Sequence, residues 1–218
     1  MRDNEGKVRA DLIAAARKLS RLGLLHGSTG NISLRIEDRI MITPTGSSLA
    51  DLEPQDLSLI DSSGAHVGGP RPSKEGFLHL AIQRARPDDN AVVHTHSTHA
   101  VAVSCLDGLD LDAPIPPLTA YFVLKVGRVK LLPYRAPGDQ TLGPLAERAA
   151  ADESVLLLRN HGPIASGGTL EEAIDRIQEL EEVCRIFLLL GDRPTRPLSL
   201  EEATALNPSL SSEHQEAN

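Results

Sequence analysis

Two short apolar segments that each lead into histidine constrain this fold more than any other feature of the chain. The first is Val92-Val93-His94-Thr95-His96, and the second is Leu156-Leu157-Leu158-Arg159-Asn160-His161. Side chains alternate between the two faces of a β-strand, so we expect His94 and His96 to point the same way, about 6 to 7 Å apart. A third ligand must come from elsewhere in the fold, and His161 follows a segment that is typical of a neighbouring strand.

Three histidines with one open position form the ligand pattern of catalytic zinc. The sequence therefore predicts that the two segments are neighbouring strands whose ends bring His94, His96 and His161 onto one ion. A competing interpretation is that one or more of these rings is hydrogen-bonded in the core or in a loop. The His-x-His spacing alone does not decide between the two.

Length and composition indicate one globular domain without a nucleic-acid or membrane partner. A chain of 218 residues can bury a single core. Its net charge of −8, with no basic stripe, argues against nucleic acid or an anionic membrane. There is no CxxC pair, no signal-like N-terminus and no apolar run near the ~18 residues that span a bilayer. We therefore expect a cytoplasmic protein with reduced thiols.

The periodicity of apolar residues predicts strands that alternate irregularly with helices. We expect strands at 31–36, 39–43, 57–61, 65–68, 91–96, 129–132 and 154–158. We expect helices at 5–22, 75–86, 100–106 and 141–151, and a longer one from 169 to just before 191. This order favours a mixed α/β sandwich over a Rossmann fold or a barrel. Residues 1–198 form the expected domain, and residues 199–218 are a polar C-terminal tail, expected to be partly disordered.

Three short polar segments have the composition of anion-binding loops. They are Gly27-Ser28-Thr29-Gly30-Asn31, Thr43-Pro44-Thr45-Gly46-Ser47-Ser48 and Pro72-Ser73-Lys74-Glu75. Glycines let backbone amides turn toward an anion, and the third segment opens a helix, where Ser73 is a candidate N-cap. Each segment alone is also an ordinary turn or cap. Beside a histidine site, Glu75 becomes a candidate metal ligand or proton acceptor.

Tyr121 is a further candidate, because a phenol can donate a proton to a carbanion, although a tyrosine beside Phe122 is also a common packing residue. The remaining histidines are interpreted as structural or surface residues, with His99 the one most closely associated with the site. These are His26, His66, His79, His99 and His214.

The ordered set of motifs resembles the class II aldolase and adducin head domain family over about residues 10–190. The motifs are Gly-Ser-Thr-Gly-Asn, Thr-Pro-Thr-Gly, Pro-Ser-Lys-Glu, Val-Val-His-Thr-His-Ser and Asn-His-Gly. The resemblance implies an α/β/α sandwich around a central, mainly antiparallel sheet. It also implies a cyclic homotetramer with its active sites between subunits.

The resemblance further implies one zinc ion per subunit, or another divalent metal, held by His94, His96 and His161. Glu75 would be the fourth ligand and acid/base group, and Tyr121 would reach a neighbouring subunit's site as proton donor. The substrate-phosphate pocket would be lined by Gly30, Asn31, Thr45, Gly46, Ser73 and Lys74.

Within that family, Pro-Ser-Lys-Glu, Pro133-Tyr134-Arg135-Ala136-Pro137-Gly138-Asp139 and Gly191-Asp192-Arg193-Pro194 are similar to 3-oxo-tetronate 4-phosphate decarboxylases. That similarity implies loss of carbon dioxide through a metal-stabilised enediolate to give dihydroxyacetone phosphate. Aldol cleavage of a ketose 1-phosphate such as fuculose 1-phosphate is the close alternative. Lys74 and the absence of a tyrosine after Tyr134 argue against it. A non-enzymatic, adducin-like interaction module is the alternative of another class.

Overall fold

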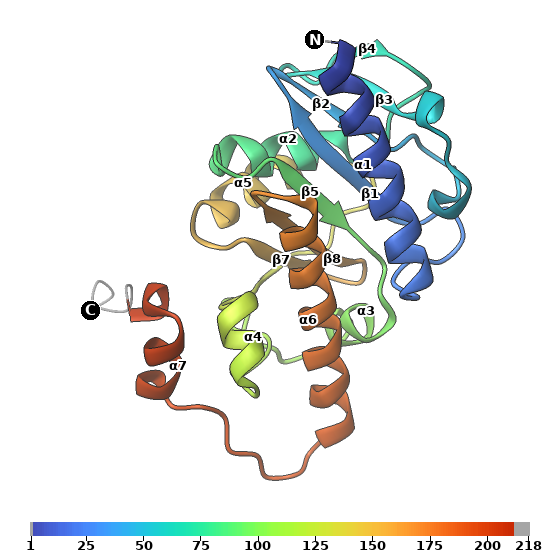
Figure 1. Ribbon diagram of the computed structural model, residues 1–218. Helices are drawn as coiled ribbons and strands as arrows, with labels where there is room; N and C mark the ends of the chain where they lie inside the picture. The colour runs from blue at the N-terminus through green and yellow to red at the C-terminus, as the bar shows by residue number, and fades with distance from the viewer. Residues whose placement is uncertain (1, 212–218) are drawn as a thin grey trace.

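A single eight-stranded sheet forms the centre of the molecule in the computed structural model, which describes residues 2–211 (Figure 1). The strand order is β4-β3-β2-β1-β5-β8-β7-β6, and every neighbouring pair is antiparallel except β6 with β7. The strands are β1 (Asn31–Ile36), β2 (Arg39–Ile42), β3 (Ser58–Asp61), β4 (His66–Gly68), β5 (Ala91–His94), β6 (Lys130–Leu132), β7 (Val155–Leu158) and β8 (Gly162–Gly167).

Helices cover both faces of the sheet. On one face pack α1 (Arg2–Arg21), α3 (Thr98–Ser104), α4 (Ala120–Lys125) and α6 (Leu170–Leu190), with α1 and α6 in front in Figure 1. On the other face pack α2 (Gly76–Ala85) and α5 (Leu142–Asp152). The expected α/β/α sandwich around a mainly antiparallel sheet is therefore confirmed.

The strand β7 is apolar at every position because helices cover both of its faces. Val155 and Leu157 join the core beneath α6, whereas Leu156 and Leu158 join the core beneath α2 and α5. A strand covered on both faces needs apolar residues at every position rather than at alternate ones.

Two expectations for the central strands were incomplete. The sequence predicted a strand through residue 96, but β5 ends at His94, and Thr95 then donates its N–H to the Pro163 carbonyl at 3.1 Å. No strand was predicted at β8, because Gly162-Pro163-Ile164-Ala165-Ser166-Gly167 has few residues that favour strands. Pairing with both β5 and β7 buries all six residues and makes β8 a central strand. The prediction that the strands leading to His94 and His161 are neighbours is therefore wrong, because β8 lies between β5 and β7.

The C-terminal segment contains a helix that the sequence analysis did not predict. Ser199 caps α7 (Leu200–Leu206) in a capping box with Glu202, and a short 3-10 turn follows at Pro208–Ser211. The rest of the expected tail, residues 212–218, lies outside the described residues, and so does His214. Within 2–211, no helix has the length and hydropathy to cross a membrane.

Candidate metal centre

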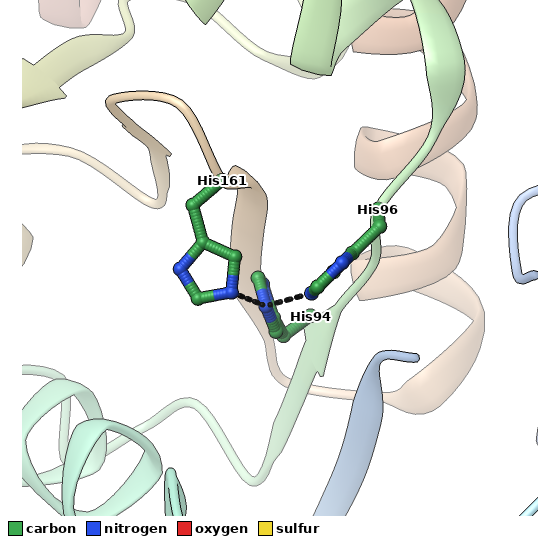
Figure 2. Close-up of side chains that lie close together, drawn as sticks. All are labelled: His94, His96 and His161. Carbon is green, nitrogen blue, oxygen red and sulfur yellow. Dashed lines mark hydrogen bonds between the residues drawn. The ribbon is translucent and has the colours of Figure 1, made fainter. Parts of the chain in front are cut away.

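The three predicted ligands converge at the end of β5. Figure 2 shows the rings of His94, His96 and His161 pointing toward one another from two segments of the chain. His94 Nε2 lies 3.1 Å from His96 Nε2 and 3.3 Å from His161 Nε2. His94 is fully buried, and His161 is 9% exposed. The group could hold a metal ion.

A tight turn between β7 and β8 brings His161 against the β5 segment. Asn160 adopts a positive φ of 55°, which asparagine tolerates better than most residues. Gly162 follows with a φ of 155°, and a Cβ there would lie 2.4 Å from the Thr95 carbonyl oxygen. Only glycine allows the turn to approach the backbone between His94 and His96 so closely.

Burial favours the neutral form of two of the imidazoles, and a hydrogen bond orients the third. His94 Nδ1 lies 2.8 Å from the Pro163 carbonyl, which only accepts, so Nδ1 carries a proton and Nε2 is the nitrogen that faces the other two rings. Burial, together with the neighbouring imidazoles, lowers the pKa of His96 to about 3 and that of His161 to about 4. Neutral imidazole is the form that binds metals.

Glu75 completes this cluster from the position that precedes α2. Its Oε2 lies 3.4 Å from His94 Nε2, and its Oε1 lies 3.3 Å from His161 Nε2. Burial acts to raise the pKa of Glu75, but the two imidazoles and a hydrogen bond from Asn31 outweigh it, so the pKa lies below its usual value. The carboxylate is therefore ionised and adjacent to the ligand nitrogens.

A buried chain of hydrogen bonds holds Glu75. Asn31 Nδ2 donates to Glu75 Oε2 at 2.8 Å, so the amide oxygen faces His79 Nε2 at 2.5 Å. An amide oxygen only accepts, so His79 Nε2 is the donor, and its Nδ1 accepts from Ser33 Oγ at 2.7 Å. Burial, with the neighbouring His94, lowers the pKa of His79 to about 3, which keeps this ring neutral.

Sequence reasoning treated His79 as structural or surface and did not connect it with Glu75. A signal was available, because residues four apart lie on the same side of a helix and Glu75 and His79 have that spacing. The partner Asn31 could not be found in this way. It is brought opposite His94 only by the antiparallel pairing of β1 with β5.

All six residues expected in the phosphate pocket line one cavity of about 170 Å³, together with Glu75, His96 and His161. The lining contains Gly30, Asn31, Thr45, Gly46, Ser73 and Lys74. Gly30 is also required by packing, since a Cβ there would lie 2.8 Å from the His94 carbonyl oxygen. The three polar loops thus lie directly beside the histidines.

Ser73 does not have its expected role as N-cap, and neither Tyr121 nor His99 lines the cavity. Ser73 is not the N-cap of α2, because the helix begins at Gly76 with Glu75 as N-cap, while Ser73 Oγ accepts the Glu75 N–H at 3.3 Å. Tyr121 lies on α4 with 65% of its surface exposed and does not line the cavity. His99 contacts Glu181 at 2.7 Å through Nδ1.

The fold and the cluster define an α/β protein with three converging histidines that could hold a metal ion, beside a polar loop pocket. The chain belongs to the class II aldolase and adducin N-terminal domain family, whose model matches residues 10–188. It is 42% identical to the 3-oxo-tetronate 4-phosphate decarboxylase of Escherichia coli K12 over 93% of this chain and 96% of the relative.

Two further comparisons agree with this family. The L-fuculose phosphate aldolase of Escherichia coli O157:H7 is 35% identical over 90% of each chain. The crystal structure of YgbL from Escherichia coli superposes with a TM-score of 0.89 at 41% identity, covering 93% of this chain and 98% of that one. These relatives include enzymes named for two reactions, decarboxylation and aldol chemistry, on phosphorylated compounds.

Proposed function

We propose that this protein is a zinc-dependent carboxy-lyase that converts a 3-oxo-tetronate 4-phosphate to dihydroxyacetone phosphate and carbon dioxide. One observation carries the proposal. Three histidine Nε2 atoms converge beside a cavity lined by glycines and Lys74, in a chain 42% identical to a decarboxylase named for that substrate.

The donor set supports zinc as the metal. Tetrahedral zinc with bonds of about 2.0 to 2.1 Å to imidazole keeps its nitrogen ligands about 3.3 Å apart. The separations of 3.1 and 3.3 Å from His94 Nε2 to the other two nitrogens agree with that spacing. Three nitrogens and one carboxylate also favour zinc over magnesium or calcium, which prefer oxygen ligands.

The reaction requires charge stabilisation and one proton. The bond from the carboxyl carbon to C2 breaks, and its electron pair stays with the three-carbon product, which then gains a proton at C2. When bound, zinc supplies a Lewis acid for the negative charge that develops on the ketone oxygen. Glu75 is the proposed fourth ligand and acid/base group, and because its pKa is lowered it begins as a proton acceptor.

The proton donor in this proposal is Tyr121 of a neighbouring subunit. A side chain with 65% of its surface exposed on α4 is free to reach another copy of the chain. The proposal therefore includes a cyclic homotetramer in the cytoplasm, with each active site between two subunits.

The phosphate end of the substrate is proposed to bind in the cavity formed by the three loops. Lys74 supplies the positive charge there, and Gly30 and Gly46 both have positive φ angles, 79° and 75°, that only glycine adopts readily. Binding energy from the phosphate, which does not react, orients the bond that breaks.

Aldol cleavage of a ketose 1-phosphate is the second candidate, favoured by the 35% identity to an L-fuculose phosphate aldolase. Purified protein loaded with zinc, incubated with phosphorylated four- to six-carbon keto acids and ketoses, separates the two reactions. We expect carbon dioxide from the keto acid and no aldehyde from the ketoses. Aldehyde release without carbon dioxide would establish the aldolase instead.

Metal analysis separates both enzymes from an adducin-like binding module. We expect about one zinc per chain in protein purified without chelator, and activity that is lost on chelation and restored by zinc. A protein that holds no metal and turns over none of these compounds would support the interaction module.

A further inference from the structure

A second cavity, of about 390 Å³, opens on the histidine cluster beside the phosphate pocket. It shares His96, Pro137 and His161 with that pocket, so the two cavities meet at the imidazole rings. A molecule held at the histidines can therefore extend into both. The proposed phosphate site occupies only one of them.

The polar groups of the second cavity differ from those of the first. Its wall includes Tyr134, Arg135 and Asn160, together with Val101, and none of the described residues in it is a carboxylate. Arg135 belongs to the segment 133–139, which the sequence analysis singled out and the proposed mechanism leaves without a role. The chemistry of this wall suits an anion or a hydrogen-bond acceptor.

Arg135 is held in place without being neutralised by an ion pair. Its Nε donates to Thr141 Oγ1 at 3.2 Å, and its Nη1 donates to the Tyr134 carbonyl at 2.8 Å. Among residues 2–211, no carboxylate lies within ion-pair distance of the guanidinium. The charge of Arg135 contributes to a lowered pKa of Asp139, but Asp139 accepts its hydrogen bonds from Thr141. An arginine that is held by two hydrogen bonds and forms no ion pair is suited to bind a carboxylate.

We propose that Arg135 binds the substrate carboxylate in this cavity and so makes the site selective for four-carbon keto acid phosphates over ketose phosphates, which have no carboxylate. The inference rests on the proposed function, because a 3-oxo-tetronate 4-phosphate has an anion at each end. The phosphate enters the cavity of Lys74, the ketone lies at the histidines, and the carboxylate faces Arg135. A ketose 1-phosphate has no carboxylate for Arg135 to bind.

The expected effect falls on binding more than on turnover. The carboxylate leaves as neutral carbon dioxide, so its attraction to Arg135 weakens as the reaction proceeds. A contact that is strongest in the ground state lowers KM without raising kcat. We expect Arg135→Gln to raise KM for the keto acid about 10- to 100-fold, in line with a charged hydrogen bond, and to change kcat much less.

A binding experiment tests the inference without turnover. The probes are erythronate 4-phosphate, which has the carboxylate, and erythritol 4-phosphate, which has a neutral alcohol in its place. Calorimetry on zinc-loaded wild-type protein should show tighter binding of the acid. Arg135→Gln should remove that preference and leave erythritol 4-phosphate binding unchanged, and Arg135→Lys should restore part of it.

Arg84→Gln is the matched control, because Arg84 is an exposed arginine of α2 that pairs with Glu147 away from both cavities. It removes the same charge and should leave the preference intact. An acid preference that survives in Arg135→Gln, or that is absent from the wild type, would overturn the inference. Failure of the proposed function has a different result, namely wild-type protein that releases no carbon dioxide from the keto acid.

Discussion

Replacing Asn31 by aspartate preserves the size of a buried side chain and turns a donor to Glu75 into a second carboxylate. Asn31 is 5% exposed, and its Nδ2 lies 2.8 Å from Glu75 Oε2. Two full charges at that distance repel by about 6 kcal/mol at an effective dielectric constant of about 20. The folded protein avoids that cost by protonating one carboxyl, which costs about 1.4 kcal/mol for each pH unit above its ordinary pKa.

The loss of stability should therefore depend on pH. With an ordinary value of 4.5 for Glu75, protonation costs about 5 kcal/mol at pH 8 and under about 1 kcal/mol at pH 5. The pair has a raised pKa in the folded state, so the variant is close to wild type at low pH and loses stability as the pH rises. For a chain of this length, the loss at pH 8 corresponds to about 10 to 20 °C in Tm.

Thermal unfolding of Asn31→Asp and wild-type protein, both stripped of metal by a chelator, measures this difference at pH 5 and pH 8. Gln55→Glu makes the same change from amide to carboxylate at an exposed position and should give the same Tm as wild type at both values. An equal loss for Asn31→Asp at both pH values would show that packing, not charge, is responsible. Full stability at pH 8 would refute the hydrogen bond to Glu75.

The remaining predictions concern the ligands, the proton donor and acid stability. His94→Ala should abolish bound zinc and turnover while the chain stays folded by circular dichroism. His66→Ala, at an exposed position in β4, should retain both bound zinc and turnover. Metal-dependent activity in His94→Ala would contradict the assignment of His94 as a ligand. Tyr121→Phe should lower kcat much more than it weakens substrate binding in steady-state kinetics, and unchanged turnover would exclude Tyr121 from the mechanism. Metal-free protein should lose stability as the pH falls from about 6.5 toward 3. His79 and His96 have a pKa of about 3 when folded and an ordinary pKa of 6.5, so these histidines take up protons in the unfolded chain at a higher pH than in the folded one. A constant Tm over that range would contradict the burial of these rings as neutral groups.

The sequence alone was sufficient for features that depend on local pattern. Residues 31–36 were predicted as a strand and form β1 over the same range, because alternating side chains and a polar turn are local signals. The apolar run before His161 predicted a strand at 154–158, and β7 confirms it at Val155–Leu158. The convergence of His94, His96 and His161 was also predictable, because histidines at this spacing after apolar runs form a recognisable pattern.

Only the tertiary structure decided the features that depend on contacts between distant segments. The strand β8 has weak local preference and exists because β5 and β7 pair with it on both sides. The chain from Ser33 through His79 and Asn31 to Glu75 joins β1 to α2. The cavity of Arg135 is formed where residues near 96, 135 and 160 meet. Local sequence encodes residue types and periodicity, whereas pairing register and packing determine which of these groups meet.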